Sequence, residues 1–205
     1  MPNRRQLCAA ALLLPLAASA AEDRLWFIFL EKGKPTPPDK DAVMAMQRGH
    51  IENFKRLFAL GRLMSAGPLA DPTGHKRGIV TVRAASREEL MGYFQPDEYV
   101  REGYMTVNAV PATAQRAHHT EGIDATKVEE LRIVLVPRSA PAPHAGLRAL
   151  VDAGTLGAWY TLEEGPVAEV LFARTTDTAA LQAVLAPLTK DAQVWRQWIS
   201  PGVVR

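Results

Sequence analysis

The sequence predicts an α+β protein built from two tandem units, each running β-α-β-β-α-β along the chain. Strand-like stretches rich in aromatic and β-branched residues alternate with amphipathic helical stretches in this order, before residue 112 and again after residue 127. Landmarks recur at nearly constant spacing: LFALGRL (57–63) aligns with LVDAGTL (150–156) at an offset of 93, and PDEYV (96–100) with KDAQV (190–194) at 94. Identity between these segments is low, but their repeated order indicates an internal duplication.

The first unit, residues 22–111, opens with RLWFIFLE (24–31), an aromatic and apolar run typical of a buried strand. GKPTPP then breaks the chain, and a helix is expected from about Asp39 to Leu60. Asp39 or Asp41 can cap its first turn, and Gly61 suits the position just past its end.

The rest of the first unit predicts two strands, a helix and a closing strand. RLMSAGPL (62–69) and RGIVTVRA (77–84) are the strands, joined by a turn at DPTG. SREELMGYF (86–94) is a helix with Ser86 and Glu89 spaced as a capping box, and YMTVNAVP (104–111) closes the unit.

The second unit, residues 128–205, repeats this order after a polar segment, residues 112–127, that we interpret as a linker. Its predicted elements, in order, are LRIVLVP (strand), PHAGLRALVDAG (helix), TLGAWYTLE and VAEVLFART (strands), TDTAALQAVLAPL (helix) and WRQWIS (strand).

Each β-α-β-β-α-β unit makes a four-stranded antiparallel sheet with both helices on one face, which is the ferredoxin-like arrangement. The other face is apolar and would be left in water, so two such units are expected to pack their sheets together. The predicted fold is therefore a pseudo-dimeric α/β barrel within one chain, which can exist as a monomer.

The first 21 residues predict a cleaved signal peptide. MPNRRQ is a short basic region, LCAAALLLPLAA an apolar run too short to span a bilayer, and ASAAED offers small residues for cleavage after Ala20 or Ala21. Arg4-Arg5 weakly resembles a twin-arginine export signal, and an ordinary basic region is the alternative. We expect a periplasmic or secreted protein with no membrane segment after cleavage.

Cleavage also changes the cysteine count and the charge. The single cysteine, Cys8, leaves with the signal peptide, so the mature chain has no thiol for a disulfide or a metal. Removing Arg4 and Arg5 leaves 22 basic and 22 acidic side chains. This neutral balance does not favour a nucleic-acid partner.

His50 is the first candidate for chemistry. Met46, His50, Phe54 and Leu57 fall on one stripe of the first helix, so His50 is expected to face the sheet. Read from the stripe alone, it is a core histidine bonded to a backbone carbonyl. Gly49 beside it costs about 1 kcal/mol relative to alanine in a helix, and could allow close approach of a ligand or relieve a clash.

The stretches HIENFKRLFALGRLMSAGPL, SREEL, PDEYVREGY and VNAVP resemble the YciI-related (YCII) family of ferredoxin-like proteins over about residues 24–111. The resemblance implies a catalytic pair of His50 and Asp97 in a cleft beside the sheet. The family usually has proline after this aspartate, where this chain has Glu98, so the local turn and the charge of the cleft can differ. The alternative for Asp97 is a turn or helix-end carboxylate.

The implied chemistry is cofactor-independent. A carboxylate that accepts a proton from one imidazole nitrogen fixes the tautomer and makes the other nitrogen a general acid or base. This suits a lyase, isomerase or hydrolase acting on a small cyclic or carboxylated molecule. The same fold could instead serve as a non-catalytic module that binds a small ligand or a protein, or carry a decayed site, because fold does not decide function.

Ser65, Gly67 and Pro68 are the predicted substrate-binding residues. Gly67-Pro68 is expected to shape the turn out of the second strand near the cleft, and Ser65 could reach a ligand, although a strand serine commonly faces solvent. Arg62 could contact an anion or simply be solvated.

The second unit keeps less of this pattern. His144 is one position out of register with His50, Asp191 matches Asp97, and Trp159 and Tyr160 stand where the Gly-Pro would be. We expect a partner unit that completes the packing and walls the pocket.

Neither a metal nor a cofactor is expected. His118, His119 and Glu121 lie in a polar linker without a scaffold for a metal cage. Trp195 and Trp198 are expected to fill the core between the sheets. The chain lacks the nucleotide-binding, acyl-transfer and zinc-protease motifs GxGxxG, GxxxxGK[ST], GxSxG and HExxH.

Overall fold

The computed structural model describes residues 23–205, so the predicted signal peptide with Arg4, Arg5 and Cys8 lies outside the described residues. The strands are β1 (Arg24–Lys32), β2 (Leu63–Ala70), β3 (Lys76–Ala84), β4 (Met105–Arg116), β5 (Glu129–Pro137), β6 (Ala158–Leu162), β7 (Val167–Ala173) and β8 (Gln193–Ile199). The helices are α1 (Lys40–Ala59), α2 (Arg87–Tyr93), α3 (Glu98–Arg101), α4 (His144–Asp152) and α5 (Thr178–Leu185). No helix in this range is long and apolar enough to cross a membrane.

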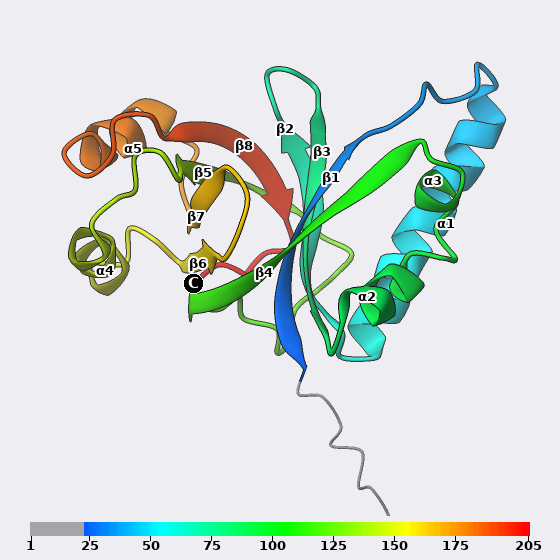
Figure 1. The fold of residues 1–205 in the computed structure, drawn as a ribbon, viewed down its shortest axis with the longest axis horizontal. Helices are drawn as coiled ribbons and strands as arrows, with labels where there is room; N and C mark the ends of the chain where they lie inside the picture. The colour runs from blue at the N-terminus through cyan, green and yellow to red at the C-terminus, as the bar shows by residue number, and fades with distance from the viewer. Residues whose placement is uncertain (1–22) are drawn as a thin grey trace, which may run out of the picture.

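The strands form one closed antiparallel barrel in the order β1-β3-β2-β8-β5-β7-β6-β4 (Figure 1). Within it, the first half contributes β4-β1-β3-β2 and the second half β8-β5-β7-β6, which is the same order of strands. The edge strands of one half pair with those of the other, β2 with β8 and β4 with β6. The predicted α+β barrel is confirmed, and closure removes every open sheet edge from it.

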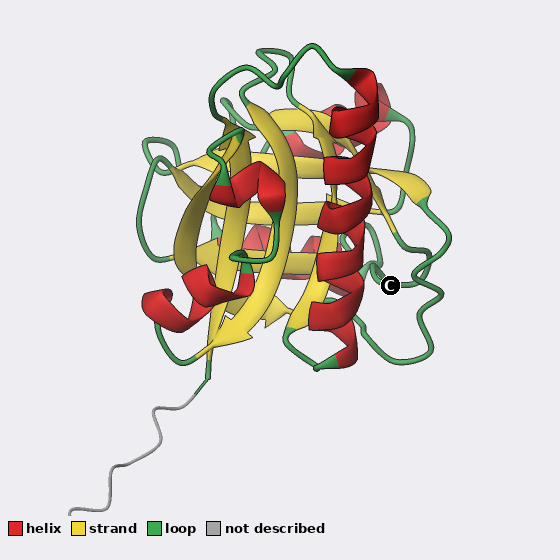
Figure 2. Cartoon of the chain, turned by 90° about the vertical axis from the view of Figure 1, so that its right-hand side faces the viewer, coloured by secondary structure: helices red, strands yellow, loops and turns green. Residues whose placement is uncertain are grey.

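The barrel wall is apolar on both faces. Along β1, Phe27 and Phe29 point into the barrel interior, whereas Trp26, Ile28 and Leu30 pack in a separate cluster with helix residues. The helices lie outside the strands, and α1 runs along one side of the barrel (Figure 2). This arrangement explains why the first strand reads as a continuous apolar run rather than an alternating one.

The predicted helix ends of the first half are confirmed. The Asp39 carboxylate accepts hydrogen bonds from the backbone N–H groups of Asp41 and Ala42, and Gly61 has a φ of 68° just past the C-terminus of α1. The Ser86 hydroxyl accepts from the Glu89 N–H, while the Glu89 carboxylate accepts from the N–H of Ala85. These bonds satisfy N–H groups that a helix start leaves unpaired.

Two elements differ from expectation. β4 continues to Arg116, into the segment interpreted as linker, because Ala112 to Arg116 pair with β6 of the other half. The short helix α3 follows Asp97 where only a turn was expected. The extension of β4 depends on a strand distant in sequence, which local patterns do not reveal, whereas α3 is capped locally by the Asp97 side chain.

The expected turn at Gly67-Pro68 is wrong. Both residues lie inside β2, where Gly67 pairs with Ile79 and Pro68 with Gly78. A Cβ built on Gly67 would lie 1.8 Å from the carbonyl oxygen of Trp198 in β8. Gly67 is therefore required where the two halves of the barrel close on each other.

Replacing Gly67 with alanine should destabilise the protein by about 1–3 kcal/mol, because the β2 and β8 backbones must move apart. Gly49→Ala is the matched control: a Cβ there meets nothing within 4 Å, so the variant should gain about 1 kcal/mol of helix stability. Urea unfolding measures both changes. Equal stability of Gly67→Ala and the wild type would contradict this account of barrel closure.

The barrel interior also holds a histidine. His118 is buried, with its ring 4.5 Å from that of Phe172 and 5.0 Å from that of Tyr160. Neither ring nitrogen has a hydrogen-bond partner among the described residues. Burial lowers the pKa of His118 from 6.5 to about 3, so the imidazole is neutral in the folded protein.

This histidine predicts sensitivity to acid. The unfolded chain binds a proton at His118 below pH 6.5, whereas the folded chain does so only near pH 3. The free energy of unfolding should therefore decrease as the pH is lowered from 6.5 toward 3. The decrease should be steeper than in His118→Leu by about 1.4 kcal/mol per pH unit. Urea midpoints across the pH range test this, with the exposed His75→Gln as control. Parallel curves for wild type and His118→Leu would contradict it.

Candidate functional site

The inward face of α1 carries the candidate histidine. Met46, His50 and Leu57 of the predicted stripe are buried, Phe54 is partly buried, and Asn53 joins them. His50 faces the barrel side of the helix, as expected. A Cβ on Gly49 would meet no protein atom within 4 Å, so this glycine does not relieve a clash.

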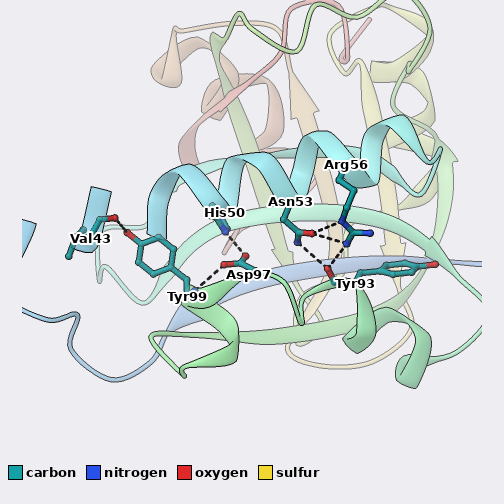
Figure 3. Close-up of polar contacts among 7 residues, drawn as sticks. All are labelled: Val43, His50, Asn53, Arg56, Tyr93, Asp97 and Tyr99. Atoms are coloured by element: carbon teal, nitrogen blue, oxygen red, sulfur yellow. Dashed lines mark hydrogen bonds and ion pairs between the residues drawn. The ribbon is translucent and has the colours of Figure 1, made fainter. Parts of the chain in front are cut away.

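The structure brings His50 and Asp97 into direct contact (Figure 3). His50 Nδ1 lies 2.5 Å from Asp97 Oδ2, and the two side chains are 11% and 0% exposed. The other carboxylate oxygen, Oδ1, accepts a hydrogen bond of 3.1 Å from the backbone N–H of Tyr99 at the start of α3. Both oxygens are therefore paired, which a fully buried carboxylate requires.

Aromatic rings enclose the imidazole on two sides. The His50 ring centroid lies 4.5 Å from that of Phe54 and 5.7 Å from that of Tyr99, both edge-on. The Tyr99 hydroxyl donates to the carbonyl of Val43 on the first turns of α1. The ring is consequently held from the helix side and from α3, and its freedom to rotate is small.

The second ring nitrogen of His50 is left free. Within residues 23–205, Nε2 has no hydrogen-bond partner, and it is not among the fully buried unpaired atoms. His50 lines a cavity of about 620 Å³ between α1, β2 and the start of β3. Nε2 is therefore the ring atom that a molecule in the cavity can reach.

All three predicted substrate-binding residues line the same cavity, namely Ser65, Gly67 and Pro68. The Ser65 side chain does not face solvent: Ser65 is buried, and its hydroxyl lies 2.8 Å from that of Thr81. Asp97 does not line the cavity and contacts it through His50.

Both halves of the chain build the cavity walls. Ile123 and Val128, from the segment that connects β4 to β5, line one side, together with Ile199, Ser200 and Val203 from the end of the chain. The expected wall residues Trp159 and Tyr160 do not line it: both are buried, Trp159 beneath the second half's helices and Tyr160 inside the barrel. The second half thus completes the cavity with other residues than the sequence indicated.

A polar cluster next to the site was not expected from the sequence. Asn53 donates to the carbonyl of Tyr93, and Arg56 donates to both Asn53 Oδ1 and the Tyr93 carbonyl (Figure 3). These bonds tie α1 to α2 three residues after His50. The signal lay in the helical spacing, because Asn53 falls on the inward face between His50 and Leu57.

The second half has a different histidine–carboxylate pair. Its helix α4 begins at His144, and Pro143, which caps the helix, stands at the offset of 93 from His50. His144 Nε2 lies 2.8 Å from Glu169 Oε1, and the other Glu169 oxygen accepts from Trp159 and Thr161. Asp191 is exposed and does not contact His144. The two sites are therefore not equivalent.

The other candidates lie outside the cavity. Arg62 forms an ion pair of 2.5 Å with Asp23. Trp195 packs against the barrel core, and the ring of Trp198 lies under Arg196. The part of the chain that the structure describes holds no cluster of three or more metal-ligating side chains.

No protein-family model and no curated protein sequence matches the chain. Among solved structures, a candidate monooxygenase from Lactobacillus acidophilus NCFM is similar with a TM-score of 0.47 and 8% identity, covering 86% of this chain and 93% of its own. A candidate monooxygenase from Fusobacterium nucleatum has a TM-score of 0.47 and 7% identity, covering 91% and 94%. Similarity at this level says nothing about the chemistry of this chain.

Removing the histidine side chain should lower the free energy of unfolding substantially only in the first half. His50→Ala leaves the buried Asp97 carboxylate with one partner and should cost about 3 kcal/mol at neutral pH. The matched control, His144→Ala, removes a side chain that is 56% exposed and leaves Glu169 its two other donors, so it should cost less than about 1 kcal/mol. Thermal or urea unfolding gives both values, and equal costs would contradict the difference between the pairs.

Proposed function

We propose that the protein is an acid–base enzyme that moves a proton on a small organic molecule bound in the cavity beside α1. One observation carries the proposal: Asp97 holds His50 through Nδ1, while Nε2 is unpaired among residues 23–205 and not fully buried, on a residue that lines the cavity. A histidine that only packed would have both nitrogens satisfied or enclosed. We also infer that the chain is a YciI-related protein of two ferredoxin-like repeats, exported from the cytoplasm.

The Asp97 contact determines which nitrogen of the neutral imidazole carries the proton. An ionised carboxylate only accepts hydrogen bonds, so in the neutral ring the proton resides on Nδ1 and the lone pair on Nε2. When Nε2 takes a proton, the imidazolium remains bonded to the buried carboxylate, which stabilises its charge. His50 is therefore the proposed catalytic residue, and Asp97 the proposed positioning residue.

The proposed step is a proton transfer. Nε2 removes a proton from a carbon next to a carbonyl group, and the electron pair of the broken C–H bond moves into an enolate. Nε2 then returns a proton, which can first exchange with solvent, to another carbon of the delocalised anion, which gives an isomer, or the enolate expels a leaving group, which gives elimination. Both routes balance without an oxidant or reductant. The apolar cavity walls, including Phe54, Phe58 and Leu63, favour this transfer by excluding water.

Proton exchange tests the proposal. Cyclic ketones, unsaturated lactones and β,γ-unsaturated carboxylates are incubated with the protein in D2O, and deuterium incorporation is followed by NMR. The wild type should exchange protons of at least one of these classes, and His50→Gln should slow the exchange by about 100-fold or more. Asp97→Asn should slow it by a similar factor, because the orientation of the ring and its tautomer are lost.

His144→Gln is the control and should exchange at the wild-type rate. Compounds that bind the wild type, lose affinity in His50→Gln and never exchange would contradict catalysis and favour a non-catalytic binding module. Exchange that persists in His50→Gln would place the chemistry elsewhere.

A further inference from the structure

Two β-bulges border the cavity, and each places an extra residue in its wall. In β2, Leu63 pairs with Val82 and Ser65 with Thr81, which leaves Met64 without a partner in β3. In β3, Gly78 pairs with Leu30 and Lys76 with Glu31, so Arg77 is the extra residue opposite β1. Met64 and Arg77 both line the cavity. A bulge commonly redirects a side chain next to a site in this way.

The charged side chains that line the cavity are all cationic, apart from the titratable His50. Lys55 on α1 and Arg77 on β3 line it, and no aspartate or glutamate does. Within residues 23–205, Arg77 has neither an ion pair nor a side-chain hydrogen bond. Several other arginines, such as Arg62 and Arg132, are paired with carboxylates. The five N–H donors of Arg77 are therefore available to a ligand.

Arg77 and His50 both have Tyr99 as a neighbour. Burial raises the pKa of the Tyr99 hydroxyl, while the nearby Arg77 lowers it and the Asp97 carboxylate raises it. The Tyr99 ring in turn packs edge-on against His50. Because Arg77 and His50 also line the same cavity, one small ligand can contact both.

The second half provides an internal comparison. The same bulge recurs between β5 and β7, where Val136 pairs with Glu169 and Pro137 with Val167. The extra residue there is Ala168, at the position of Arg77, and Pro143 stands at the position of His50. The bulge therefore occurs in both halves, whereas an arginine at the bulge and a histidine at this helix position occur together only in the first half.

We propose that Arg77 binds the anionic group of the substrate, and that the substrate is an organic anion with an apolar body, such as a cyclic or aromatic carboxylate. The proposal rests on the proposed function and names the substrate class of the same site. The apolar body lies against Phe54, Phe58 and Leu63, and the carboxylate accepts hydrogen bonds from the guanidinium. Arginine suits this role because its planar donors match both oxygens of a carboxylate.

Two fluorescent probes of similar shape and different charge test the proposal. 1-Anilinonaphthalene-8-sulfonate is an anion, and N-phenyl-1-naphthylamine is its neutral counterpart. Replacing Arg77 with glutamine should weaken the affinity for the anionic probe at least tenfold and change the affinity for the neutral probe less than twofold. Arg77→Lys should give an intermediate loss, because lysine keeps the charge without the planar donors. Arg48→Gln removes an exposed charge of α1 outside the cavity and should leave both affinities unchanged.

Each other outcome overturns the proposal. Unchanged anion affinity in Arg77→Gln means that Arg77 is a solvated side chain. Equal losses for both probes mean that it acts through the fold, and equal losses in Arg48→Gln mean that the effect is general surface charge. The probes measure binding alone. If the protein discriminates them as expected but exchanges no protons, the anion site is supported and the catalytic proposal is contradicted. If the protein exchanges protons but does not discriminate the probes, the catalytic proposal is supported and the anion site is contradicted.

Discussion

The pairing of edge strands between the two halves is the constraint on which the rest of the structure depends. β2 with β8 and β4 with β6 convert two four-stranded sheets into one barrel whose interior is shared. The closure is tight at Gly67, where only a residue without a side chain fits against the Trp198 carbonyl. Because both seams must form together, we expect the two halves to unfold as one unit.

The same closure positions the cavity. Along β2, pairing with β8 is confined to Leu69 and Ala70, so the preceding stretch from Ser65 to Pro68 is free to line the cavity. The connecting segment and the end of the chain supply the remaining wall. The candidate site is thus assembled by both halves, although His50, Asp97 and Arg77 all come from the first.

The two halves share a fold and differ in their polar residues. Both have the bulge on the strand next to their first, but one carries Arg77 there and the other Ala168. In the first half, a histidine on a long helix contacts a buried aspartate. In the second half, an exposed histidine contacts a glutamate that also accepts a hydrogen bond from Trp159. The order of strands is the same in both halves, and the cavity beside α1 lies where His50, Arg77 and residues from the end of the chain meet.

Most of the fold could be predicted from the sequence, because strand and helix periodicity and helix caps are local properties. The apolar run Trp26–Leu30, the Asp39 and Ser86 caps and the repeat spacing were sufficient to predict the barrel. The pairing of His50 with Asp97 was implied by a resemblance to a family, and the structure places these side chains in contact, although their role remains a prediction. The placement of Gly67-Pro68 was wrong, since a Gly-Pro pair commonly marks a turn and only the neighbouring β8 explains it within a strand.

By itself the sequence determined the order of the eight strands and four of the five helices in residues 23–205, the inward position of His50 and the balance of charge, since each depends on nearest neighbours or on composition. The tertiary structure alone decided which histidine nitrogen is free, which carboxylate each histidine meets and where the cavity lies. It also decided that Arg77 lines the cavity, because a bulge exists only relative to a paired strand. These properties arise from contacts between residues that lie tens of positions apart in the sequence, and local sequence patterns do not predict such contacts.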